Sequence, residues 1–216
     1  MRKHEIGSAV PEHWQSSWEG KFETFSHFEF AAGIPQVICA IATRKPNGKM
    51  NICLHAWNGF QGTEDAFRCY LPGLFSWCHT VVSLRKTPEF TVNFLSHTHM
   101  EALRKTISDN DWDADEFALA GFHEEPSAVI GTPRIAEAFL TLECQLEALA
   151  PLGNPDNLMA VGKVVHAAAH EGYMDGIDKR YGSEGFMFNI HSPQKAASGE
   201  EGATGVGVMA LLEVQS

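Results

Sequence analysis

An alternation of apolar and polar residues from Phe139 to Leu149 constrains the fold more than any other feature of this chain. The apolar positions are Leu140, Leu142, Cys144, Leu146 and Ala148, and the polar positions between them are Thr141, Glu143, Gln145 and Glu147. Successive side chains of a β-strand point to opposite faces of a sheet. The pattern therefore predicts a strand with one buried face and one wet face.

Four more segments have the composition of strands. Pro35–Thr43 and Met50–Phe60 flank Asn47-Gly48, a dipeptide that tolerates positive φ, so the two runs are expected to form an antiparallel hairpin. Glu89–Leu95 alternates in the same way, and Leu158–Ala169 follows a turn at Gly153-Asn-Pro155.

Helices are predicted at about 79–86, just before Thr87-Pro88, and at about 98–107. The strands do not alternate regularly with helices, so a doubly wound Rossmann sheet is the weaker interpretation. The sequence predicts a mainly β fold, a β-barrel with a few inserted helices.

The 216 residues are interpreted as one domain with an extension at each end. Residues 1–25, with Trp14 and Trp18, are expected to form an N-terminal arm, and residues 26–193 the domain. Residues 194–216 are expected to form a glycine-rich link and an apolar C-terminal tail.

The charge balance excludes one class of partner. The 16 Lys and Arg against 27 Asp and Glu give a formal charge of −11, which disfavours a nucleic-acid binder. A phosphate-bearing ligand remains compatible, because helix N-termini bind anions. The acidic stretch 109–125 lacks the glycine and terminal glutamate of a calcium loop, so a solvated loop and cap region is expected.

Neither a metal site nor a membrane span is predicted. The five cysteines contain no CxxC pair, and His97-x-His99 has no third ligand beside it, so a capping or surface role is favoured. No stretch reaches about 18 apolar residues. We therefore expect a soluble, reduced, cytoplasmic protein. Hydrolase and P-loop motifs are also missing from the sequence.

Two segments carry the chemistry. Asn51, Cys53, His55 and Trp57 alternate with apolar or small neighbours, which suits a strand edge facing a planar, hydrogen-bonding ring. His79-Thr80 opens a predicted helix, where hydroxyls and free amides suit a phosphate.

The order of these motifs is similar to a known family. The residues are Pro35, Ala42-Thr43-Arg44, Asn47-Gly48-Lys49, Asn51-Ile52, Trp57, His79-Thr80, Glu89-Phe90, Val92-Asn93-Phe94-Leu95, then Asp115-Glu-Phe-Ala-Leu-Ala-Gly121-Phe, Pro133-Arg-Ile-Ala-Glu137 and Leu142-Glu-Cys144. Over residues 30–190 this succession resembles the flavin reductase-like, FMN-binding split-barrel family, of the flavoredoxin type.

The resemblance implies a six-stranded split barrel that forms a homodimer and binds FMN. It implies that the strand 51–57 faces the isoalloxazine and that His79 and Thr80 take the phosphate. The implied FMN-binding residues are Thr43, Asn51, Cys53, Leu54, His55, Ala56, Trp57, His79 and Thr80. The chain departs from the family at Thr63–Ala66, in place of an Asp-Pro-Pro-like segment, and at Cys53 and His55, where small or hydroxyl residues are frequent.

The implied activity is hydride transfer from NAD(P)H to flavin, with no catalytic side chain identified. An FMN electron carrier reduced by a redox protein partner, and a sensory or storage flavin-binding protein, are the alternatives. His55 is either a tuner of the flavin or a packing histidine, and Cys53 is either a redox thiol or an inert buried one.

Overall fold

The computed structural model describes residues 3, 5–12, 26–64, 66–107, 111–176, 180–190 and 206–212. The described chain forms two compact units, and it passes between them at Gln36/Val37, Met187/Phe188 and Gly207/Val208. The larger unit contains every predicted site residue. The division into arm, domain and link remains a prediction, because most of 1–25 and all of 194–205 lie outside the described residues.

The elements are as follows. The strands are β1 (Gln36–Val37), β2 (Cys39–Arg44), β3 (Met50–His55), β4 (Gly59–Thr63), β5 (Ala66–Phe75), β6 (Glu89–Phe94), β7 (Glu124–Glu125), β8 (Arg134–Ile135), β9 (Leu140–Leu152), β10 (Asn154–Ala169), β11 (Met187–Asn189) and β12 (Val206–Val208). The helices are α1 (His27–Ala32), α2 (His79–Lys86), α3 (Met100–Thr106), α4 (Glu116–Ala120) and α5 (Glu171–Met174), with a 3-10 turn η1 (His97–His99).

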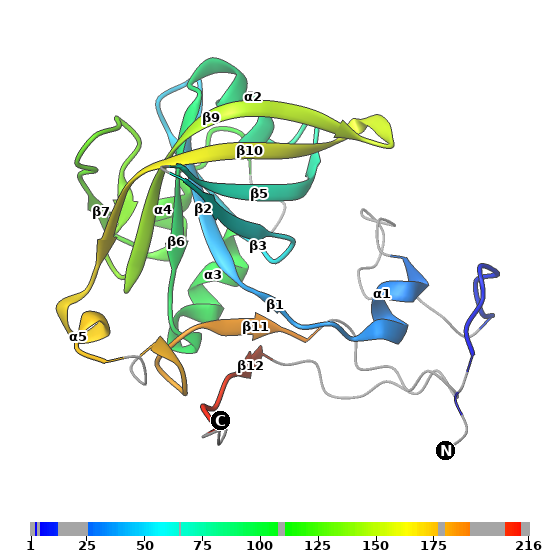
Figure 1. Cartoon of the computed structure of the whole chain (residues 1–216). Helices are drawn as coiled ribbons and strands as arrows, with labels where there is room; N and C mark the ends of the chain where they lie inside the picture. Colours follow the sequence, from blue (N-terminus) through cyan, green and yellow to red (C-terminus); the bar gives the residue numbers. More distant parts are fainter. Residues whose placement is uncertain are drawn as a thin grey trace. The chain divides into compact units, whose positions relative to one another are not determined.

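The main sheet has seven strands in the order β3-β2-β6-β9-β10-β5-β4, and its pairings are antiparallel. Figure 1 shows it curling, with β9 and β10 crossing over β2 and β6. Two small sheets, β7-β8 and β1-β11-β12, accompany it. The mainly β prediction is confirmed.

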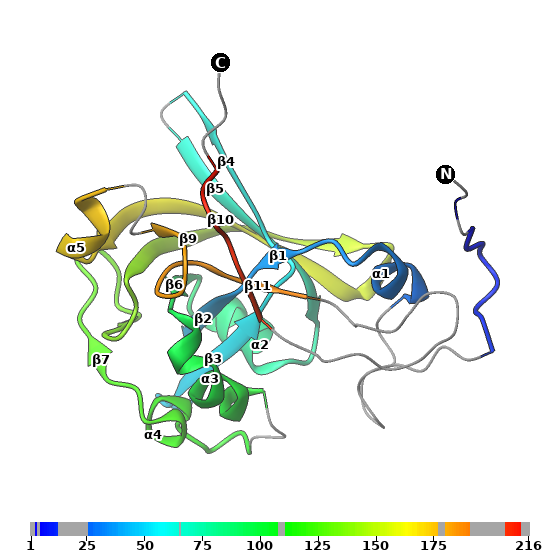
Figure 2. The ribbon, with the colours of Figure 1, turned by 90° about the horizontal axis from the view of Figure 1, so that it is seen from below.

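The strand count differs from the six implied by the resemblance. The run Met50–Phe60 was expected to be one strand, but β3 ends at His55 and the chain restarts as β4 at Gly59. Strands β4 and β5 form a hairpin at one edge of the sheet (Figure 2). Most of β4 is exposed, so it lacks the alternation by which β9 was recognised.

The predicted wet face of β9 is covered over its first half. Thr141 and Glu143 are buried. Thr141 Oγ1 donates to Asn93 Oδ1, while Glu143 accepts from the N–H groups of Ala128 and Val129 and from Arg134. The loop that leads into β8 therefore lies over this face, and hydrogen bonds make the burial of its polar groups possible.

Helices α2, α3 and α4 pack near the β3 edge of the sheet. The predicted helix at 79–86 is found as α2, and the predicted 98–107 helix as η1 followed by α3. Helix α2 packs on β2, β3 and β5, whereas α3 and α4 pack on β3. None of the described helices is long and apolar enough to cross a membrane.

Candidate functional site

The site begins at the outer edge of β3. Because β3 pairs only with β2, alternate N–H groups of β3 point away from the sheet. Met50 N donates to Asp115 Oδ2 at 3.3 Å and Ile52 N donates to Glu116 Oε2 at 2.7 Å. The next N–H in this series belongs to Leu54 and points to the same outer side of β3. The outer edge of β3 thus presents the N–H of Leu54 as a hydrogen-bond donor, next to the two N–H groups that Asp115 and Glu116 occupy.

An amide in the interior links this edge to α2. Asn51 lies opposite Thr43 in the β2–β3 register. Its Nδ2 donates to Thr43 Oγ1 at 3.0 Å and to Thr80 Oγ1 at 3.1 Å. All three residues are buried. The Asn51 amide therefore uses both of its hydrogens to hold β2, β3 and the start of α2 together.

Helix α2 begins at this junction. Its N-cap residue Cys78 makes no side-chain capping hydrogen bond, and Arg85 and Lys86 lie in its last turn. The first N–H groups of a helix have no partner within the helix, and they carry the positive end of its dipole. The start of α2 can accordingly receive an anion.

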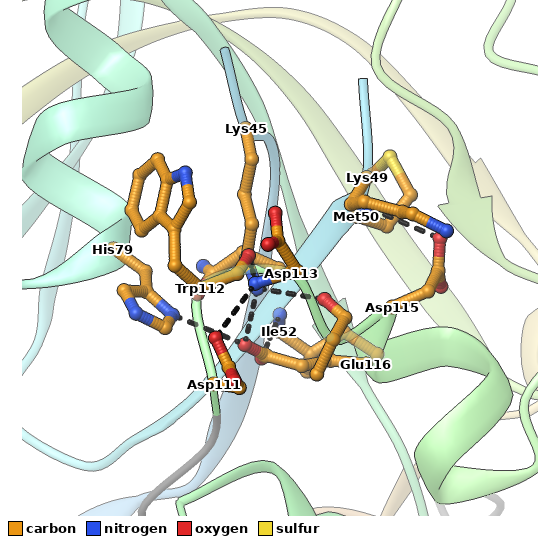
Figure 3. Close-up of polar contacts among 12 residues, drawn as sticks. Lys45, Lys49, Met50, Ile52, His79, Asp111, Trp112, Asp113, Asp115 and Glu116 are labelled. Atoms are coloured by element: carbon orange, nitrogen blue, oxygen red, sulfur yellow. Dashed lines mark hydrogen bonds and ion pairs between the residues drawn. The ribbon is translucent and has the colours of Figure 1, made fainter. Parts of the chain in front are cut away.

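A buried ion-pair network contacts His79, the first residue of α2 (Figure 3). Glu116 Oε1 lies 3.1 Å from Lys45 Nζ and 3.3 Å from His79 Nδ1, and its side chain is only 1% exposed. Lys45 Nζ also donates to the carbonyl oxygens of Ala114 (2.9 Å) and Trp112 (3.3 Å). The ammonium thus has three acceptors, which offsets the cost of burying it.

The predicted residues at the end of β3 differ in their surroundings. His55 is 5% exposed, and its Nε2 has no hydrogen-bond partner. Burial lowers the pKa of His55 to about 4, so the ring is neutral at pH 7. Burial, together with the nearby Cys78 thiol, raises the pKa of Cys53 to about 12. A neutral thiol is a poor nucleophile, which favours the inert role for Cys53.

Ala56 and Trp57 follow β3 in the link to β4. Trp57 packs against Gly73, whose φ of +79° and missing side chain leave room for the indole. A Cβ at Gly73 would lie 2.9 Å from Trp57 Cε3. His55 and Trp57 meet edge to face, with ring centroids 6.1 Å apart. Trp57 is therefore held against β5 beside the free edge of β3.

All nine predicted residues thus lie on β2, β3, the link after β3 and the start of α2, within one compact unit. Sequence reasoning missed Lys45, Glu116 and Trp112, since the acidic stretch was interpreted as solvated. Asp115 does cap α4, as expected for that stretch, but Glu116 is buried. The signal that could have revealed Glu116 is its position between a capping aspartate and the apolar run 117–120.

A cavity of about 500 Å³ lies elsewhere, and it contains none of the predicted residues. Its lining includes Phe139, His170, Tyr173 and Tyr181. His97, for which the sequence favours a capping or surface role, makes a 2.6 Å hydrogen bond from Nδ1 to the Ser183 carbonyl oxygen. The described residues contain no group of three or more side chains that could hold a metal ion.

Comparison with known proteins decides the family. The family model of the flavin reductase like domain matches residues 63–183, more than half of the chain. The chain belongs to the flavin reductase-like family. An uncharacterised protein of Halalkalibacterium halodurans is 29% identical over an alignment of 123 residues, and the match covers 49% of this chain and 59% of that protein. The chain thus matches this relative over less than two thirds of its length.

Solved structures of other proteins share the fold of this chain. Component B of nitrilotriacetate monooxygenase from Bacillus cereus superposes with a TM-score of 0.70 at 15% identity, covering 98% of this chain and all of that one. Flavoredoxin of Desulfovibrio vulgaris gives 0.68 at 14% identity, covering 94% and 97%. An FMN-binding protein from Thermus thermophilus with bound p-hydroxybenzaldehyde gives 0.66 at 17%, covering 94% and 99%. The predicted split-barrel fold is confirmed.

Proposed function

We propose that this flavin reductase-like chain is an FMN-dependent oxidoreductase that accepts a hydride from NAD(P)H. The observation that carries the proposal is the junction made by Asn51, which fixes the free edge of β3 beside the start of α2. A flavin mononucleotide has the matching chemistry, a planar ring with hydrogen-bonding edges and a terminal phosphate. The family supports a flavin as the cofactor.

The residues present fit this group. The outward N–H of Leu54 suits an acceptor on the ring, with Ala56 and Trp57 beside it. The first turn of α2, with His79 and Thr80, suits the phosphate. When bound, the flavin supplies the redox chemistry, and the protein supplies orientation and electrostatics. The hydrogen bond between Thr43 and Asn51 holds β2 and β3 together at the site, and the side chains of Cys53 and His55 on β3 are neutral.

The test uses the purified full chain. We expect a yellow protein that releases one FMN per chain on denaturation and loses its colour within seconds of anaerobic mixing with NADH or NADPH. A colourless protein that binds no added FMN would contradict the cofactor. Retained FMN that neither nucleotide reduces would contradict the reductase activity.

The second candidate is an FMN electron carrier reduced by a protein partner. The similarity to flavoredoxin favours it, and the charge of −11 suits docking on a basic redox protein. Reduction by a protein donor but by neither nicotinamide nucleotide would select the carrier. For neither function do we propose a membrane or a nucleic acid as a partner.

We further propose a cytoplasmic homodimer, as the resemblance implies. All five cysteines are free, which suits a reducing compartment. Light scattering on the purified chain should give twice the monomer mass of 23.8 kDa. A monomer at micromolar concentration would contradict the dimer.

A further inference from the structure

The imidazole of His79 is held from behind by Glu116. Its Nδ1 lies 3.3 Å from Glu116 Oε1. An ionised carboxylate only accepts hydrogen bonds, so Nδ1 carries a hydrogen; in the imidazolium form Nε2 carries a second one, which a phosphate oxygen can accept. The ring also meets Trp112 edge to face, with centroids 4.7 Å apart at 83°. These two contacts fix the orientation of the ring.

The other nitrogen faces outward. Nε2 lies across the ring from Nδ1, and the His79 side chain is 26% exposed while the Glu116 side chain is 1% exposed. His79 is also the first residue of α2. Its Nε2 therefore lies at the same end of the helix as the N–H groups of the first turn.

The Glu116 carboxylate is suited to hold a ring rather than to bind a ligand. Its Oε2 accepts from Ile52 N at 2.7 Å, and its Oε1 pairs with Lys45 Nζ at 3.1 Å. Lys45 balances its charge, so the carboxylate does not oppose an anion at α2. Asp111 and Asp113 flank Trp112 in the same close-up (Figure 3), where Asp113 accepts from Asn47 Nδ2 at 3.0 Å and Asp111 accepts from Asp113 N at 3.2 Å. Burial raises the pKa of the adjacent Cys78 thiol, which keeps it neutral.

We propose that Glu116 is a positioning residue for phosphate recognition: it holds Nδ1 of His79 on the protein side and directs Nε2 toward the phosphate of a phosphorylated flavin. The inference rests on the proposed function and makes it more specific. It predicts that the site discriminates FMN from riboflavin, which has the same ring system without a phosphate, and that Glu116 supports this discrimination without touching the ligand.

The experiment measures the Kd of FMN and of riboflavin for the full chain and three variants. In Glu116→Gln the Kd of FMN should rise about tenfold, the effect of weakening one charge-assisted hydrogen bond, while the Kd of riboflavin should change less than about twofold. His79→Ala should show the same selective loss. In the His79→Ala background, adding Glu116→Gln should change the Kd of FMN little, because the two residues act as one unit.

Glu143→Gln is the matched control. Glu143 is another buried carboxylate of the same unit, paired with Arg134, and none of its contacts involves a predicted site residue. This variant should lose stability without selective loss of FMN. Its purpose is to separate a general effect of a disturbed buried charge from an effect on phosphate recognition.

Parallel loss of FMN and riboflavin in Glu116→Gln would overturn the proposal, since a purely structural role predicts that result. Should Glu116→Gln fail to fold, the decision falls to His79→Ala, in which unchanged discrimination would overturn the proposal. Equal affinity of the unmodified chain for both flavins would overturn the role of His79 and leave the flavin site intact. Binding of neither flavin would overturn the proposed function and, with it, this inference.

Discussion

Three charged or polar side chains at the candidate site owe their properties to burial. Lys45 and Glu116 neutralise each other behind α2, whereas His55 has no such partner and stays neutral. An unpaired ionisable group in an apolar environment gives up its charge more readily than it retains it. Glu116 is therefore a paired charge beside α2, whereas protonation of His55 in acid should destabilise the fold.

His55 should make the protein less stable in mild acid. Burial lowers its pKa from 6.5 to about 4 in the folded chain, so between these values the unfolded chain binds more protons. This contribution to stability is complete above pH 6.5 and is lost as the pH falls toward 4, by about 3 kcal/mol in total. Denaturant titrations at several pH values should show a shallower pH dependence for His55→Gln than for the unmodified chain.

The control for this prediction is His170→Gln, at an exposed histidine in the same unit. Its pH dependence should follow that of the unmodified chain. If His55→Gln keeps the full slope between pH 4 and pH 6.5, the buried ring is not the source of the effect.

One physical reason explains why the sequence did not reveal the buried pair of Lys45 and Glu116. Lys45 and Glu116 are separated by 71 positions, and Lys and Glu are ordinarily exposed, so nothing local marks them as a buried pair. His79 was found because its helix, which ends just before Thr87-Pro88, can be recognised locally. The same contrast holds for Glu143, which alternation assigned to water but which the 126–135 loop covers.

At the level of elements, strands with strong local signals were predicted well. The Asn47-Gly48 turn does join β2 to β3, and alternation correctly located β9. The hairpin of β4 and β5 was missed because β4 is mostly exposed and pairs only with β5, so its stability comes from the partner strand. The small helix α4 was missed too, since five residues carry too little periodicity to be recognised.

The close packing of three strands depends on one glycine of β10. A Cβ at Gly162 would lie 2.4 Å from Phe90 Cζ and 3.0 Å from Cys69 Sγ, and both neighbours are fully buried. Gly162→Ala should therefore lower the free energy of unfolding by about 1–3 kcal/mol, the usual cost of overpacking. Gly59→Ala on β4 is the control, because its Cβ would meet nothing closer than 4.0 Å. Equal stability of the two variants in urea would contradict this explanation.

The junction between β3 and α2 makes a second prediction. Thr80→Val removes the hydroxyl that accepts from Asn51 Nδ2, leaving a buried N–H without its partner. Stability should fall by about 1–3 kcal/mol, and FMN should be retained less well because the edge of β3 and the start of α2 are no longer fixed together. Thr80→Ser, which keeps the hydroxyl, should retain FMN. A Thr80→Val chain as stable and as yellow as the unmodified protein would refute the role of this junction.

For the whole molecule, an acidic chain can hold an anionic cofactor because the relevant field is local. The formal charge of −11 is a property of the entire surface, whereas a phosphate bound at α2, as proposed, would meet backbone N–H groups and the imidazole of His79. Two of the nearby acidic residues are engaged in the fold, because Glu116 pairs with Lys45 and Asp115 caps α4. Net charge therefore excludes a polyanion spread over the surface but not a single phosphate at one helix.

This argument predicts how the melting temperature responds to different anions. FMN at about 100 times its Kd should stabilise the folded chain by about 2.7 kcal/mol, which for a chain of this size corresponds to about 5–10 °C. Riboflavin at the same concentration should raise the melting temperature less, because it lacks the phosphate. Duplex DNA should leave it unchanged, since the overall surface repels a polyanion. A shift with DNA as large as that with FMN would show that the folded protein attracts anions in general, and the phosphate would then have no defined place at α2.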